Sequence, residues 1–213
     1  MAFIAIFAAI NYVVFSYLKI DIPLAAGSSV AIHVANAIVV VSAFLLGPVE
    51  GGVAGAIGLS IADLLDPRYV ASAPKTFFLK FCIGYLAGKV GQKLGLNRAE
   101  DNRQAMKIAA VSAAAGLGFN VIFDPIIGYL FKRFILGINA EAAAIILTWT
   151  GGVTAFNAVT VSYTHLDVYK RQGHLSEYFQ PAGQADSFQR SRRRSGGKLG
   201  ILRRRPDADV SSA

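Results

Sequence analysis

The most site-like pair of polar residues in the sequence is Asn120 and Asp124, which lie four positions apart inside a long apolar run. In a helix this spacing places both side chains on one face. The adjacent Pro125 frees a backbone carbonyl one turn earlier, and that carbonyl can accept a hydrogen bond. A carboxylate and an amide on one face can hold the hydrogen-bond donors of a polar ring. The alternative is a structural kink capped by Asn120.

Two other pairs of polar residues occur at membrane depth nearer the N-terminus. His33 and Asn36 are spaced to lie on successive turns near the outer end of an expected helix, so one cavity could receive both. Lys80 lies about one turn inside the apolar run at 76–90, and Lys75 precedes that run. Ionisable groups at this depth usually face a cavity or a partner, so both lysines favour an anionic or carbonyl-bearing ligand. The alternatives are a structural histidine and lysines that snorkel to the membrane surface.

Near the end of the apolar part, Trp149 and Asn157 add an aromatic face and an amide. A flat heterocycle would be held by this combination, because aromatic rings stack and amides pair with ring donors and acceptors. Trp149 facing lipid or packing inside a bundle is the alternative.

Enzyme signatures are absent from the sequence. It contains no HExxH, GxSxG or GxxxxGK[ST] motif, so neither a zinc hydrolase, a serine hydrolase nor an ATP site is indicated. Its single cysteine, Cys82, permits no intrachain disulfide and matches no zinc or redox spacing. We therefore predict a chain that is not an enzyme and has no cofactor or metal. An intramembrane enzyme using His33 and Asp124 is the alternative.

The composition indicates which solvent surrounds these residues. Hydrophobic residues make up 54% of the 213 residues and charged residues 16%, with a mean hydropathy of +0.48. A soluble domain keeps more charge than this on its surface, so the sequence predicts an all-α protein of the cell membrane, in contact with the lipid bilayer.

Six apolar runs are candidates for membrane-spanning helices, because a helix of about 20 mostly apolar residues crosses the hydrocarbon core. The first run has no basic residues before it and no cleavage site after it, so we interpret it as a span and not as a secretion signal. We expect a six-helix bundle over residues 1–160, with spans at 2–18, 30–46, 51–65, 76–90, 108–131 and 142–160.

The connection between the fourth and fifth spans is the longest and most basic one. Since loops rich in lysine and arginine stay in the cytoplasm, this connection sets the orientation, and six spans then place both termini in the cytoplasm. The basic residues concerned are Lys89, Lys93, Arg98, Arg103 and Lys107.

The hydrophobic pattern stops abruptly at residues 161–172, VSYTHLDVYKRQ. One codon choice for this segment is its own reverse complement and resembles two head-to-head transposon ends from sequencing-library preparation. We interpret 161–172 as a library artefact, which would cut the sixth helix short, and 173–213 as an unrelated or out-of-frame basic tail, disordered and outside the fold. Its arginine triplets at 192–194 and 203–205 could suggest nucleic-acid binding, but we predict no nucleic-acid partner.

One stretch carries a family resemblance. Residues 33–89 contain HVANAIVVVSAFLLGPVEGGVAGAIGLSIADLL followed by APKTFFLKFCIGYLAGK. With the six-span layout, this stretch resembles the substrate-binding S components of energy-coupling factor (ECF) transporters, especially the riboflavin-type branch. The glycine-rich part of the run also predicts close contact between the second and third helices, because small residues let backbones approach.

The resemblance implies a vitamin or vitamin precursor, bound on the extracellular side and delivered for ATP-driven uptake when the S component topples in a complex with a transmembrane T component and two ATPases. It also implies that Ala5 and Ala9, spaced as a small-residue strip on the first helix, meet the T component. The substrate-binding candidates under this interpretation are His33, Asn36, Lys75, Lys80, Asn120, Asp124 and Trp149. A self-sufficient carrier or channel is the alternative function.

Overall fold

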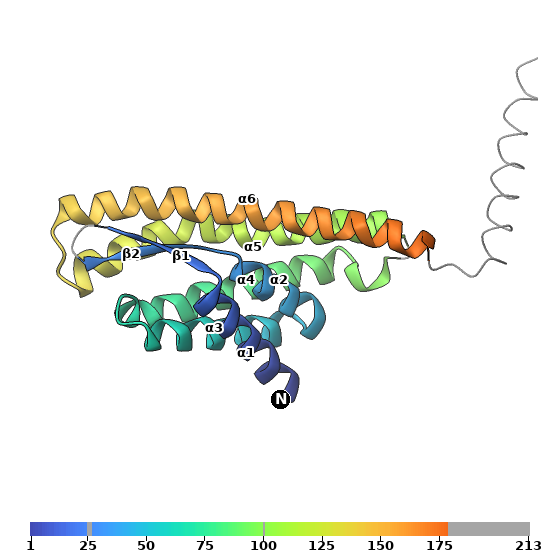
Figure 1. The fold of residues 1–213 in the computed structure, drawn as a ribbon, viewed down its shortest axis with the longest axis horizontal. Coiled ribbons are helices and arrows are strands. Elements are labelled where there is room, and N and C mark those ends of the chain that lie inside the picture. Colours follow the sequence, from blue (N-terminus) through green and yellow to red (C-terminus); the bar gives the residue numbers. More distant parts are fainter. Residues whose placement is uncertain (25–26, 100, 179–213) are drawn as a thin grey trace, which may run out of the picture. The chain divides into compact units, whose positions relative to one another are not determined.

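The computed structural model describes residues 1–24, 27–99 and 101–178, with side chains described as far as Ser162. The chain divides into two compact units, Met1–Tyr169 and Lys170–Ala213, and the first holds the cavity and contacts considered below. The elements in chain order (Figure 1) are α1 (Ala2–Tyr17), β1 (Lys19–Pro23), β2 (Ser29–His33), α2 (Ala35–Leu46), α3 (Pro48–Leu65), the 3-10 turn η2 (Val70–Ser72), α4 (Ala73–Lys93), the 3-10 turn η3 (Leu96–Arg98), α5 (Asn102–Leu130), the π-helical turn η4 (Phe131–Ile135) and α6 (Ala140–Tyr178).

The six helices are confirmed, but the all-α prediction is wrong for residues 19–33. Strands β1 and β2 form an antiparallel hairpin in which Lys19 pairs with His33 and Pro23 with Ser29. Strand pairing satisfies backbone groups that a loop at membrane depth would leave without partners. The expected second helical span at 30–46 therefore begins as a strand, and its helix starts only at Ala35.

Three helical segments in the described part of the chain are long and apolar enough to cross a membrane: Pro48–Leu65, Asn102–Ile135 and Ala140–Ser162. By contrast, α2 has 12 residues, which at 1.5 Å per residue span only about 18 Å. The helix count thus agrees with the expected bundle, while six complete crossings and two cytoplasmic termini stay predictions.

Glycines set the close packing of α3 against its neighbours α1, α2 and α4. A Cβ added to Gly51 would overlap the backbone of Ala43 in α2, and one added to Gly84 of α4 would lie 2.6 Å from the Cα of Gly52. The predicted contact between the second and third helices is therefore present. Gly58, in the same glycine-rich run, instead meets the backbone of Ala8 in α1.

Helices α5 and α6 run side by side (Figure 1), joined by a hydrogen bond from Thr154 to Asp124. Helix α5 continues through Pro125 and ends in the π-helical turn at Phe131–Ile135. The sixth helix was expected to end near residue 160, but α6 extends to Tyr178. No proline or glycine interrupts residues 153–172, so nothing in this segment breaks the helix. The artefact interpretation of 161–172 stays a prediction, and residues 179–213 of the predicted tail lie outside the described residues.

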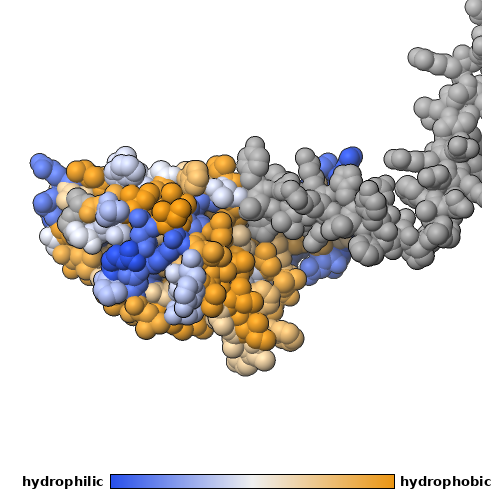
Figure 2. All heavy atoms as spheres, viewed as in Figure 1, coloured by the Kyte–Doolittle hydropathy of each residue, from blue (hydrophilic) through white to orange (hydrophobic). Residues whose placement is uncertain are grey.

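The surface is largely apolar, as a lipid-facing protein requires. Figure 2 shows hydrophobic residues over most of the visible face, with hydrophilic residues gathered in a smaller patch. Large exposed apolar side chains occur on many helices, among them Phe3, Leu64, Phe78, Ile122 and Phe156.

Candidate functional site

A polar cavity of about 90 Å³ lies between the hairpin and the helices, with space for several water molecules. Its walls come from α1, β2, α2, α3, α4, α5 and α6, so residues far apart in the sequence meet there. The polar side chains that line it include His33, Asn36, Asp63, Tyr69, Lys75, Thr76, Lys80, Asn120, Asp124, Lys132, Thr154 and Asn157.

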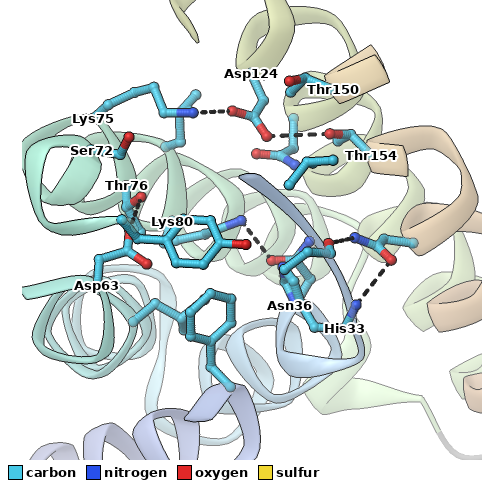
Figure 3. A pocket seen from close by; sticks show the side chains of 18 of the residues that line it. His33, Asn36, Asp63, Ser72, Lys75, Thr76, Lys80, Asp124, Thr150 and Thr154 are labelled. Atoms are coloured by element: carbon cyan, nitrogen blue, oxygen red, sulfur yellow. Dashed lines mark hydrogen bonds and ion pairs between the residues drawn. The ribbon is translucent and has the colours of Figure 1, made fainter. Parts of the chain in front are cut away.

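An ion pair between Lys75 and Asp124 crosses one side of the cavity (Figure 3). The Lys75 Nζ lies 2.7 Å from Asp124 Oδ1, and the Thr154 hydroxyl donates to Asp124 Oδ2 at 3.2 Å. This chain of contacts joins α4, α5 and α6. The two ionic side chains are only 13% and 15% exposed, so the charge of each depends on the other.

A second pair of polar contacts lies deeper between the helices (Figure 3). Lys80 donates to Asn36 Oδ1 at 2.9 Å, and Thr76 donates to Asp63 Oδ2 at 2.5 Å. Lys80 is 7% exposed and Asn36 2%. The sequence placed Lys80 where it could either snorkel or face inward, and in the structure it faces inward.

Strand β2 is held to α6 by Asn157. Its Oδ1 accepts from the backbone N–H of His33 at 3.1 Å, and its Nδ2 donates to the carbonyl of Ala31 at 3.1 Å. The sequence had suggested that His33 and Asn36 lie on successive turns of one helix. In the structure His33 instead ends strand β2, and only Asn36 lies in a helix. The His33 ring packs edge-on against Phe15, with centroids 4.9 Å apart.

Two buried atoms at the cavity have no hydrogen-bond partner among the described residues: His33 Nδ1 and Asn120 Oδ1. His33 is 8% exposed and Asn120 1%. A buried polar atom without a partner costs about 1–3 kcal/mol. A solute that supplied the missing partners would recover part of this free energy on binding.

An ion cluster outside the cavity ties the hairpin to the connection between α3 and α4. Asp66 lies 2.7 Å from Lys19 and 2.8 Å from Arg68, while Arg68 also reaches Asp21 at 2.7 Å. Tyr69 donates its hydroxyl to Asp21 at 2.7 Å. The guanidinium of Arg68 holds the pKa of Asp66 well below its ordinary value. Burial raises the pKa of Tyr69 above its ordinary value, which keeps the phenol protonated as a donor.

The variant Asp66→Asn is expected to loosen the hairpin, because it removes the carboxylate that pairs with the largely buried ammonium of Lys19 and with the guanidinium of Arg68. Because the folded pKa of Asp66 is lowered, its stabilisation is complete above about pH 4 and is lost as the pH falls through the folded pKa. Amide hydrogen exchange of residues 19–33, corrected for intrinsic rates, should be faster in the variant at pH 7. Unchanged exchange in these residues would contradict this role of the ion cluster. The control is Glu141→Gln, which alters an exposed carboxylate on α6.

A comparison with known families matches the model described as "ECF-type riboflavin transporter, S component" to residues 1–171, most of the chain. The chain belongs to this family. A solved structure described as "Structure and mechanism of the S component of a bacterial ECF transporter" is similar at 19% sequence identity and a TM-score of 0.47, covering 84% of this chain and 96% of that one. No curated protein matches the chain. Membership of the S-component family makes this a membrane-embedded, substrate-binding transport subunit and not an enzyme.

In this S component, six of the seven predicted substrate-binding residues line the cavity: His33, Asn36, Lys75, Lys80, Asn120 and Asp124. Trp149 does not. Its side chain is 51% exposed, because it precedes Thr150 by one residue and a helix turns about 100° per residue. The two alanines of the predicted partner strip, Ala5 and Ala9, are both exposed on α1.

Several lining residues escaped the sequence analysis. Thr150 and Thr154 are two of them. They share one face of α6 with Asn157, which the sequence did single out, at the spacing i, i+4, i+7, a signal that could have been recognised. Phe15 and Tyr69 supply the aromatic surface that was assigned to Trp149. Helical periodicity could not have identified Lys132 as a lining residue. It lies in a π-helical turn, where side chains no longer follow the 3.6-residue spacing of the α-helix before it.

Proposed function

We propose that this S component captures a riboflavin-like vitamin or vitamin precursor on the extracellular side and passes it on for ATP-driven uptake with a T component and two ATPase subunits. The observation that carries the proposal is the buried cavity in which His33 Nδ1 and Asn120 Oδ1 have no hydrogen-bond partner in the part of the chain that the structure describes. Phe15 and Tyr69 offer ring surface beside these polar atoms, and this combination suits a flat heterocycle with donors and acceptors on its edge.

The extracellular placement rests on charge. Lys75 and Lys80 line the cavity from the N-terminal half of α4, whereas Lys93 closes the same helix at its C-terminal end. The 13 residues from Lys80 to Lys93 separate these positions by about 20 Å. Basic connections stay in the cytoplasm, so the cavity belongs to the opposite, extracellular half, with six crossings and both termini inside.

The partner surface is assigned to α1. Ala8 faces inward against Gly58, which leaves Ala5 and Ala9 on the outer side. Two small residues one turn apart allow another membrane helix to approach closely. We assign this strip to the T component.

The experiment is a pair of measurements on the protein in lipid nanodiscs and in vesicles. Quenching of flavin fluorescence should show riboflavin binding without ATP. Vesicles containing the chain alone should show no sustained uptake, and uptake should appear when a T component and ATPases are added with ATP. Absence of flavin binding would overturn the proposal.

Two other outcomes would favour the alternative functions. Sustained uptake by the chain alone would indicate a self-sufficient carrier or channel. Conversion of riboflavin to a product by the purified protein would indicate an intramembrane enzyme using His33 and Asp124, whereas unchanged riboflavin recovered after binding would exclude that reaction.

A further inference from the structure

The charges around the cavity do not balance. Three lysines line it, Lys75, Lys80 and Lys132, against two aspartates, Asp63 and Asp124. Within the described residues the one ion pair among them joins Lys75 to Asp124. Asp63 is instead held by the hydroxyl of Thr76. Among the described residues, Lys80 and Lys132 are therefore lysines without a carboxylate partner, in a site where unpaired charge is costly.

Lys80 retains hydrogen-bonding capacity. An ammonium has three N–H donors, and among the described residues one of them is used, on Asn36 Oδ1 at 2.9 Å. The partner is a neutral amide, which orients the ammonium without neutralising it. Because Lys80 is 7% exposed, bulk water does little to stabilise its charge.

Lys132 lines the same cavity from a later part of the chain. It lies in the π-helical turn after α5 and is 9% exposed. Its Nζ donates to the hydroxyl of Ser28, beside the hairpin, at 2.9 Å. A π-helical turn is a costly departure from α-helical geometry and is frequent at functional sites. In this chain it places a second ammonium beside the cavity, again with donors to spare.

We infer that the solute carries an anionic group, a carboxylate or a phosphate, which is bound by Lys80 and Lys132. This inference rests on the proposed function and names the charge of its substrate. An anion would accept the unused N–H donors of both ammonium groups and supply the negative charge that the described cavity lining lacks. Charge-assisted hydrogen bonds of this kind are about twice as strong as neutral ones.

The test compares two probes that share one ring system. Riboflavin is uncharged, and riboflavin 5′-phosphate differs from it by an added phosphate. Both are titrated into the full chain in phosphatidylcholine nanodiscs, where no anionic lipid competes. We expect riboflavin 5′-phosphate to bind about 10-fold more tightly, or more, since one charge-assisted hydrogen bond contributes that much.

Variants locate the anion-binding groups. Lys80→Gln and Lys132→Gln should each weaken riboflavin 5′-phosphate more than riboflavin, reducing the ratio of the two affinities toward one. The matched control is Lys89→Gln on α4, where the side chain is exposed and lies over the Tyr85 ring; it should leave the ratio unchanged. Thermal unfolding checks that each variant is folded.

The outcomes separate the inference from the function on which it rests. Riboflavin binding as tightly as its phosphate, or more tightly, overturns the anion inference and leaves the proposed function intact. A preference for the phosphate that survives both lysine substitutions also overturns it. If neither flavin binds, the proposed function fails and the inference fails with it.

Discussion

Replacing Asp124 by leucine is expected to lower the free energy of unfolding by up to about 3 kcal/mol, because it leaves the ammonium of Lys75 largely buried without its partner. Flavin affinity should fall by about 100-fold or more, since the site loses charge-assisted hydrogen bonds and its fixed geometry. Thermal unfolding and flavin titration measure the two effects separately. Glu141→Leu removes an exposed carboxylate and serves as the control.

A double variant distinguishes stability from binding. Lys75→Met with Asp124→Leu replaces the ion pair by apolar side chains of similar size, which is often neutral or stabilising. We expect most of the lost stability to return while flavin binding stays lost. Recovery of both properties would show that the pair is structural and lies outside the binding site.

The second large effect is expected at Gly51. In Gly51→Ala the added Cβ would overlap the backbone of Ala43, so α2 and α3 must separate, at a cost of about 3 kcal/mol or more. The expected result is a low yield of folded protein in size-exclusion chromatography and a lowered midpoint of thermal unfolding.

Gly118→Ala is the matched control for this prediction. Gly118 also lies within a helix, but a Cβ there would meet no atom within 4 Å. Alanine should therefore be tolerated or should stabilise the helix by about 0.5–1 kcal/mol. Equal behaviour of the two variants would contradict the close approach of α2 and α3.

The sequence predicted what depends on local pattern. The glycine-rich run indicated a tight contact between the second and third helices, and two of its glycines, Gly51 and Gly55, lie against α2 in the structure. Ionisable residues at membrane depth indicated the cavity, because unpaired charge in lipid is so costly that such residues turn inward. Lys75, Lys80 and Asp124 line the cavity for this reason.

What the sequence did not reveal depends on contacts between distant segments. Val30 and Ile32 continue the apolar run of α2, so hydropathy alone could not separate a strand from a helix there. Only the pairing of Lys19–Pro23 with Ser29–His33 makes the strand stable. Trp149 was assigned to the site by residue type, whereas the face containing Thr150 and Thr154 decided which side of α6 lines the cavity.

The two hydrogen bonds of Asn157 have a consequence for the hairpin. Ala31 and His33 lie two residues apart, so their backbone groups point to the same edge of β2. Asn157 contacts both of them, accepting from one residue and donating to the other, which is what the next strand of a sheet would do. Its amide thus acts as a single peptide unit of a third strand and covers this part of the outer edge of β2, where another chain could otherwise pair.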